Sequence, residues 1–269
     1  GCFDHISHEW LLNNIPMDKV MLRKWLKCGF VFNKELFPTE EGTPQGGIIS
    51  PTLANMTLDG LQTMLAEKYH KKFVTRKTTY YPKVHLVRYA DDFLLMFQYE
   101  EEAKRVLELL RTRLAKFGLE VAEDKTRILP IGRFKGTKED FDFLGFTFFN
   151  TKTRGGKYRL GVRTSKKKQK MKKQAAKAWL KTRLTKPVAD TMRLINLSLA
   201  GHYNYYGVSG NFHAIQGFYK YVKYATYRML NRRDQKGKFR YTKFLRVWKY
   251  YVEEPHLTTD IWNWKPTLV

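Results

Sequence analysis

Two adjacent carboxylates, Asp91 and Asp92, are the residues of this 269-residue chain best suited to chemistry. They stand between an alternating run, 84–88, and an apolar run, 93–97, which predicts a β-hairpin with both acids at its tip. Carboxylate oxygens are hard ligands that suit Mg²⁺, and a hairpin tip would hold the metal where a phosphate-bearing substrate can reach it. The alternative is a plain turn, because Asp favours turns by bonding nearby backbone groups. The pair alone leaves both interpretations open.

A glycine-rich segment upstream, 42–55, is the second candidate element of a site. Its glycines let the backbone approach a ligand closely, and Ser50 followed by Pro51 predicts an N-cap and the first turn of a helix. Apolar residues recur near helical spacing after Pro51, which predicts one helix over 51–69. The start of this helix and the loop that holds Gln45 would face an anion. This arrangement alone does not identify a function.

Together the two segments resemble the polymerase core of reverse transcriptases, in which QGG-x-x-SP is followed by YADD. The wider pattern resembles the reverse transcriptase/maturase proteins that bacterial and organellar group II introns encode, and it extends almost from end to end of the chain. The matching blocks are Gly1 to Ile6 (end of motif A), Gly42 to Asn55 (motif B), Tyr89 to Asp92 (motif C), Gly118 to Thr126 (motif D), Phe141 to Phe146 (primer grip) and Gly201 to Asn211 (maturase signature).

The resemblance implies that Asp91 and Asp92 are catalytic and bind Mg²⁺ as cofactor. It also implies a set of nucleotide-binding residues, which are Phe3, Gln45, Gly46, Ala90 and Lys125. Phe3 would gate the incoming sugar, small Ala90 would leave room for the primer end, and Lys125 would stand near the leaving pyrophosphate. A core position for Phe3 and a solvated surface position for Lys125 are the alternatives.

Beyond the catalytic core, the resemblance assigns Phe143, Leu144 and Gly145 to a turn that grips the primer backbone, a role compatible with a buried strand.

Charge supports a nucleic-acid partner: residues 1–140 carry 22 Lys and Arg against 19 Asp and Glu, whereas 141–269 carry 28 against 6. Aromatic residues interleave with these cations, which favours RNA over an anionic membrane. The RNA-binding candidates are Lys166, Lys167, Lys168, Lys170, Lys173, Arg232 and Arg233.

The expected fold class is α+β. Residues 1–163 read as a partial right-hand polymerase palm, an antiparallel sheet backed by helices, and 164–269 as an all-α thumb and maturase-specific domain. Helix boundaries follow from capping residues and glycines. The predicted signals are Asp18 and Gly29 around the second of two short helices, Gly118 after a helix from Glu100, Ser165 before a helix to about Leu184, Pro187, Asn211 before a helix to about Arg233, and Thr242.

Composition excludes several classes of protein. Two cysteines are too few for a disulfide framework or a Cys-rich zinc site, which argues against the zinc-binding endonuclease domain of some family members. No apolar run reaches the length of a membrane span and no signal peptide opens the chain, so we expect a soluble protein. Its expected location is the cytoplasm of a bacterium, or the organellar matrix in a eukaryote.

The expected function is RNA-directed DNA synthesis combined with maturase activity, with intron RNA, an RNA template, a DNA primer and dNTPs as partners. In the family, a third metal-binding aspartate would lie three residues before Gly1, so we expect this chain alone to be inactive as a polymerase. A non-enzymatic RNA-binding splicing cofactor with an incomplete polymerase site is the alternative. A reverse transcriptase of another mobile element is disfavoured by the maturase signature. The intron, its target and the oligomeric state stay open.

Overall fold

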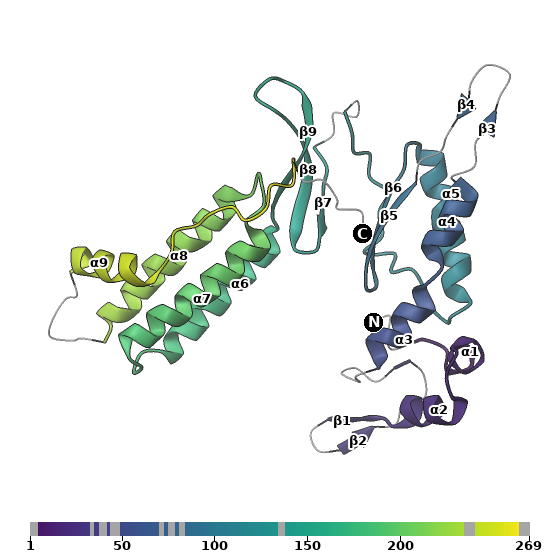
Figure 1. Ribbon diagram of the computed structural model, residues 1–269, viewed down its shortest axis with the longest axis horizontal. Helices are drawn as coiled ribbons and strands as arrows, with labels where there is room; N and C mark the ends of the chain where they lie inside the picture. Colours follow the sequence, from purple (N-terminus) through teal and green to yellow (C-terminus); the bar gives the residue numbers. More distant parts are fainter. Residues whose placement is uncertain are drawn as a thin grey trace. The chain divides into compact units, whose positions relative to one another are not determined.

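The computed structural model describes residues 5–32, 35–37, 42–43, 49–69, 73–74, 79–80, 84–133, 138–233 and 240–263. The chain divides into two compact units, residues 1–129 and 130–269. Both combine helices with small antiparallel sheets, which confirms the α+β class (Figure 1). The division falls before the predicted palm boundary at residue 163, because the sheet ahead of that boundary packs on the helices that follow it. The assignment of palm, thumb and maturase domains stays a prediction.

The first unit pairs helices with short antiparallel ribbons. Its helices are α1 (His8–Asn14), α2 (Lys19–Lys27), α3 (Ser50–Leu58), α4 (Leu61–Tyr69) and α5 (Glu100–Ala115). Its strand pairs are β1 (Phe30–Phe32) with β2 (Glu35–Phe37), β3 (Phe73–Val74) with β4 (Thr79–Tyr80), and β5 (His85–Tyr89) with β6 (Asp92–Met96). The predicted cap of α2 is confirmed, since an Asp18 carboxylate oxygen accepts the Met21 N–H at 2.7 Å.

The predicted single helix over 51–69 is wrong, because the chain breaks between α3 and α4 at Asp59 and Gly60. Gly60 has φ +76°, a left-handed conformation that ends a helix and that glycine adopts without strain. Arg113 of α5 donates to the Asp59 carbonyl and so fixes this turn. The helix also begins at Ser50, one residue early, so Ser50 is its first helical residue and not its N-cap.

Two buried clusters support the first unit. The first cluster lies among α1, α2, α3 and the end of α5, and the second among α4, α5 and the hairpin β5–β6. Figure 1 shows α4 and α5 beside this hairpin. Phe93 in β6 packs against both clusters, so the hairpin is joined to the whole hydrophobic interior of the unit.

The second unit places a three-stranded sheet at one end of a helical bundle. The strands, in sheet order, are β7 (Asp140–Phe143), β8 (Phe146–Lys152) and β9 (Tyr158–Thr164). The helices are α6 (Lys166–Thr182), α7 (Val188–Tyr206), α8 (Phe212–Asn231) and α9 (Tyr241–Tyr251). After α9 the chain returns along the bundle to the sheet (Figure 1), where Thr259 forms a bridge with Val208. None of the described helices is long and apolar enough to cross a membrane.

Three of the four boundary signals predicted in this unit are confirmed. Ser165 caps α6 by accepting the Lys168 N–H at 3.3 Å, Pro187 precedes α7, and Asn211 precedes α8. Thr242 is not a cap: α9 begins at Tyr241, so Thr242 lies in its first turn. The N-cap residue Arg240 makes no capping side-chain bond, so the burial of Phe244 and Trp248 on one side of α9 stabilises this helix instead.

Large aromatic side chains form the core of the second unit. Tyr203, Phe244 and Trp248 are fully buried, and the Trp248 indole N–H donates to the Tyr219 hydroxyl at 2.9 Å. Phe146, the first residue of β8, packs against the same cluster and stacks on Tyr205 of α7. The sheet and the bundle therefore share one interior.

Candidate functional site

The paired carboxylates lie where the sequence predicted them, at the tip of the hairpin β5–β6. Tyr89 and Asp92 are the last paired residues of the ladder, and Ala90 and Asp91 form the two-residue turn between them. Ala90 has φ +53°, which a two-residue hairpin turn requires and a small residue tolerates. The side chains of Asp91 and Asp92 are both exposed. Two carboxylates are therefore presented to solvent on a short, tightly turned hairpin.

Two anchors hold this hairpin. Phe93, next to the carboxylates, packs into the interior of the unit, and Arg88 reaches α3, where its Nη1 donates to the Asn55 side-chain oxygen at 3.1 Å. The same Nη1 approaches the Ala90 carbonyl at 3.5 Å. Arg88 thus connects the tip of the hairpin to the helix that follows the glycine-rich loop. Arg88 was not predicted as a site residue, and its place on the strand beside the carboxylates is the one sequence signal that pointed to it.

The donor set of the hairpin tip fits Mg²⁺ in kind, since both ligands are carboxylate oxygens. Within the described residues, no group of three or more His, Cys, Asp or Glu side chains is arranged to hold a metal. A site for two metal ions needs more oxygen ligands than this pair supplies. The two carboxylates alone therefore do not complete a site for two metal ions, and their role as metal ligands stays a prediction.

Two of the five residues predicted to bind the nucleotide, Ala90 and Lys125, lie in the described part of the chain. Phe3, Gln45 and Gly46 lie outside the described residues, while Ala90 lies in the carboxylate turn. Lys125 is exposed in a turn after α5. The backbone N–H groups of Lys125 and Thr126 both donate to the Ala122 carbonyl at 3.0 Å and close this turn. Among the described residues, Lys125 forms no hydrogen bond with Asp91 or Asp92.

The predicted primer-grip turn joins β7 to β8 and is held by the bundle. Leu144 and Gly145 both have positive φ, +49° and +80°, as in the two-residue turns that suit a twisted hairpin. The Tyr205 hydroxyl donates to the Leu144 carbonyl at 2.8 Å, and the Ser165 N–H donates to the Gly145 carbonyl at 3.0 Å. A Cβ on residue 145 would lie 2.9 Å from the Tyr206 hydroxyl, so glycine also provides clearance. The turn is therefore fixed against the start of α6 and the end of α7.

The predicted basic helix begins beside this turn. Lys166, Lys167, Lys168 and Lys170 are exposed around the first turns of α6, and the Lys168 side chain passes close to Gly145. Lys173 is only half-exposed, because its Nζ lies over the Tyr221 ring of α8 at 5.5 Å. The structure thus brings the grip turn and four exposed lysines together at one end of the second unit.

A neighbouring lysine, Lys172, points into the bundle instead of into solvent. Its Nζ lies 3.2 Å from His202 Nδ1 and 4.7 Å from the centre of the Tyr206 ring. Burial, reinforced by Lys168, lowers the pKa of Lys172, and burial with Lys172 nearby lowers the pKa of His202 to about 4. The His202 ring also packs on Phe218 at 4.4 Å. The contact between buried His202 and half-buried Lys172 was not predicted from the sequence, since a His in a tyrosine-rich segment gives no signal of burial.

The stability of the second unit should fall as the pH drops from about 6.5 to 4. In this pH range His202 becomes protonated in the unfolded chain but stays neutral in the folded protein, where burial lowers its pKa. The unfolded chain therefore binds more protons, and lowering the pH favours unfolding. We expect His202→Gln to remove roughly 2 kcal/mol of this pH dependence, judged by urea unfolding at several pH values. His213→Gln is the matched control, because that histidine is exposed on α8. Equal pH profiles for wild type and His202→Gln would contradict the assignment.

The two arginines predicted to bind RNA have different surroundings. Arg232 is exposed just after α8, whereas the Arg233 guanidinium donates to the carbonyls of Arg183, Leu184 and Lys186. These carbonyls follow the end of α6, where a cation also meets the negative end of the helix dipole. Arg233 therefore has an internal role in joining α8 to the α6–α7 turn, and its role toward RNA stays a prediction.

Asn211, the last residue of the predicted maturase signature, joins the sheet to the bundle. Its side-chain oxygen accepts the Thr164 N–H at 2.7 Å, and its side-chain nitrogen donates to the Thr164 hydroxyl and the Tyr206 carbonyl, both at 2.8 Å. The residue is buried. The sequence predicted only a helix start here and missed a contact between residues 47 positions apart.

Removing the Asn211 amide should destabilise the second unit by about 3 kcal/mol, since Asn211→Ala leaves the buried Thr164 N–H, the Thr164 hydroxyl and the Tyr206 carbonyl short of partners. Urea unfolding followed by circular dichroism measures the change. Asn204→Ala provides the control, because Asn204 is exposed on α7 and should have little effect. Similar losses in both variants would show that the Asn211 bonds contribute no specific stability.

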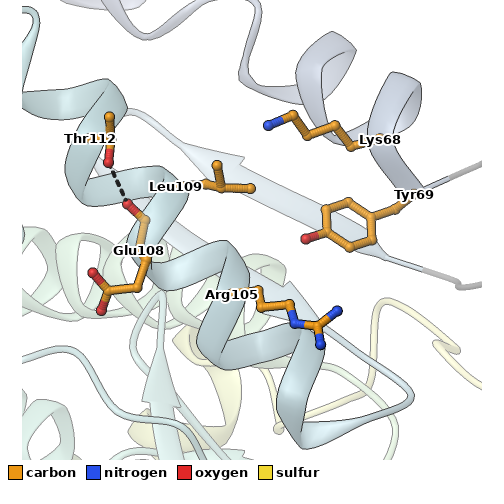
Figure 2. A pocket seen from close by; sticks show the side chains of 6 residues that line it. All are labelled: Lys68, Tyr69, Arg105, Glu108, Leu109 and Thr112. Carbon is orange, nitrogen blue, oxygen red and sulfur yellow. Dashed lines mark hydrogen bonds between the residues drawn. The ribbon is translucent and has the colours of Figure 1, made fainter.

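A groove between α4 and α5 lies apart from the predicted site residues. Figure 2 shows its lining, which is Lys68, Tyr69, Arg105, Glu108, Leu109 and Thr112. The dashed bond in the figure is internal to α5, from the Thr112 hydroxyl to the Glu108 carbonyl at 3.0 Å. Glu108 also pairs with Arg111, and burial raises the pKa of Tyr69. None of the residues predicted for catalysis or nucleic-acid binding lines this groove.

A mixed α+β unit that presents two carboxylates on a hairpin beside helices is the arrangement of a nucleic-acid polymerase palm. Residues 1–148 match the family of reverse transcriptases (RNA-dependent DNA polymerases), so the chain belongs to this family and its first part has the palm type of fold. The family recognised from QGG-x-x-SP and YADD is thereby confirmed.

The names of two similar proteins refer to introns. The group II intron-encoded protein LtrA of Lactococcus lactis subsp. cremoris is 31% identical over 162 residues, which cover 54% of this chain and 27% of LtrA. The putative COX1/OXI3 intron 2 protein of Saccharomyces cerevisiae is 26% identical over 54% of this chain and 22% of its own length, and the Escherichia coli protein YkfC is 26% identical over 59% and 47%. The chain thus spans less than half the length of these relatives.

Proposed function

We propose that this chain forms the carboxylate-bearing palm, primer grip and thumb of an RNA-directed DNA polymerase encoded by a group II intron. The observation that carries the proposal is the pair Asp91 and Asp92, exposed on the hairpin tip of a chain that belongs to the reverse transcriptase family. The reaction forms a bond between the primer 3′ oxygen and the α-phosphorus of a dNTP and releases pyrophosphate. Mg²⁺ held by the two carboxylates would activate the 3′ hydroxyl and offset charge on the leaving group.

The chain's own residues would position the substrates around this centre. Arg88 and Phe93 keep the carboxylates at a fixed place on the palm, and Ala90 leaves space for the primer end. Phe3, Gln45, Gly46 and Lys125 complete the proposed nucleotide site by resemblance to the family. The turn at Phe143, Leu144 and Gly145 would hold the primer backbone, because the bundle fixes its two central carbonyls.

The second unit would also bind the intron RNA as a maturase. Two features support this role: the excess of cations in residues 141–269 and the exposed lysines around the start of α6. Phosphate contacts from such lysines give affinity without sequence preference. The intron-encoded relatives are consistent with the same RNA partner.

Primer extension tests the polymerase proposal. The protein that carries this chain should extend a DNA primer on an RNA template with dNTPs, and EDTA should stop the reaction. A DNA primer on a mismatched template and a reaction with ribonucleotides provide the controls. The proposal would be contradicted if the sequence of the product did not depend on the template, or if extension continued in EDTA.

A splicing cofactor without polymerase activity is the second candidate. It is favoured by one observation, that the described residues supply two carboxylates and no larger ligand group for metals. Such a protein would bind intron RNA and raise its splicing rate in vitro while primer extension stays at background. Splicing and extension measured on the same preparation therefore separate the two functions.

A further inference from the structure

The hairpin β8–β9 ends in a basic tip that the polymerase site does not use. Between the two strands the chain turns at residues 153–157, and the tip carries the exposed cations Lys152, Arg154 and Lys157. Backbone bonds close the turn: the Thr153 N–H donates to the Lys157 carbonyl at 2.8 Å, and the Gly156 N–H donates to the Thr153 carbonyl at 2.9 Å. The Thr153 hydroxyl also accepts the Lys157 N–H at 3.2 Å. The cations therefore sit on an ordered turn and not on a loose loop.

Among the residues that the structure describes, no carboxylate pairs with these three cations. Within the described part of the chain, Lys152, Arg154 and Lys157 form no ion pair, and the sequence has no acid between Asp142 and Asp190. Arg163, farther along β9, differs from them because it pairs with Asp140 at 2.7 Å. Three uncompensated cations on one turn fit a polyanion better than a neutral partner.

The sheet holds the basic tip at a set distance from the primer-grip turn, because strand β8 runs from one to the other. Seven residues of β-strand, Phe146–Lys152, separate them by about 20 Å. Cross-strand contacts stiffen this spacer: the Phe149 ring covers Gly161, and the Tyr158 hydroxyl donates to the Asn150 side-chain oxygen at 3.0 Å. From the returning C-terminal segment, Trp262 stacks under the Arg159 guanidinium at 3.5 Å.

We propose that this basic tip contacts the sugar–phosphate backbone of the primer–template duplex about six to eight base pairs from the primer end. A distance of about 20 Å spans roughly six base pairs at the B-form spacing of 3.4 Å and slightly more in the A-form duplex of DNA and RNA. The inference rests on the proposed function, because it takes the turn Leu144–Gly145 as the part that holds the primer backbone near its 3′ end. The contact would be independent of sequence. It would form only when the duplex behind the growing primer end is long enough to reach the tip.

A charge-removal variant tests the contact. In the 269-residue chain, Lys152→Gln, Arg154→Gln and Lys157→Gln together should lower the log–log salt slope of primer–template binding by about 3, near 0.9 for each phosphate that the tip no longer neutralises. The matched control replaces Lys177, Lys181 and Lys186 by Gln, since these exposed cations lie in the second half of α6 and in the turn after it, away from the sheet. The control should leave the slope near its wild-type value. Circular dichroism confirms that each variant is folded.

Neutral phosphates then locate the contact. Methylphosphonates placed about five to eight nucleotides from the primer 3′ end should weaken binding by the wild-type chain and by the control variant. The same methylphosphonates should not weaken binding by the tip variant any further, because this variant lacks the cations that contact those phosphates. Methylphosphonates placed about twelve to fifteen nucleotides away should affect all three proteins equally.

The outcomes separate this inference from the proposed function. One outcome would overturn the tip contact and leave the polymerase assignment in place. In that outcome, binding depends on the α6 lysines but does not change when methylphosphonates are placed about five to eight nucleotides from the primer 3′ end. Absence of any primer–template binding would overturn both. Loss of binding to anionic lipid vesicles in the tip variant, with nucleic-acid binding unchanged, would identify the tip as a membrane contact and reject the proposal.

Discussion

In the protein that carries this chain, Asp91→Asn should lower RNA-templated primer extension by on the order of 10³-fold or more. An amide oxygen binds Mg²⁺ more weakly than a carboxylate and removes one negative charge from the metal site, and several kcal/mol of lost transition-state stabilisation correspond to this factor. The folded state should not suffer, because the Asp91 side chain is exposed on the turn. Single-turnover extension at saturating primer–template and dNTP measures the effect on the chemical step.

The matched control is Asp59→Asn, an identical change in another exposed turn of the same unit. It should extend primers at the wild-type rate. Both variants should keep the wild-type unfolding free energy within about 0.5 kcal/mol. Near-wild-type extension by Asp91→Asn would remove the carboxylate pair from the metal site, and a parallel loss of stability would assign the effect to folding.

Local signals in the sequence predicted local structure well. Alternating and apolar runs on both sides of Asp91 and Asp92 predicted the hairpin, because a period of two and a turn of small and acidic residues have few other solutions. Asp18 and Ser165 predicted helix starts, since each side chain meets an N–H three residues away. The break at Gly60 was missed because a glycine inside a helical pattern is tolerated often enough not to end it.

Contacts between distant segments could not be predicted from the same signals. Arg88 with Asn55, Asn211 with Thr164, and Tyr205 with Leu144 join residues 33, 47 and 61 positions apart, and periodicity carries no information on such pairs. Arg233 shows the same limit: its charge made it an RNA candidate, while its surroundings give it three carbonyl partners. The residue types of a site are visible in a sequence, but their partners depend on the tertiary fold.

Replacing Lys166, Lys167, Lys168 and Lys170 together by Gln should weaken binding to every RNA by a similar factor and reduce the salt slope by up to about 3.6, near 0.9 for each phosphate contact. All four side chains are exposed around the first turns of α6, beside the grip turn, and the described residues pair none of them with an acid. Glutamine forms helices about as well as lysine, so α6 should keep its structure. Filter binding of cognate intron RNA and of random RNA across a salt series measures the slope.

The same loss of charge on the first unit provides the control. Lys24, Lys27, Lys104 and Lys116 are exposed there, and Lys104 is already offset by Glu100 and Glu101 at 3.1 and 3.2 Å. If affinity follows net charge alone, the two quadruple variants will lose binding equally. If α6 is a true contact surface, its variant will show the larger loss and the flatter salt slope, because only phosphates in direct contact release counterions on binding.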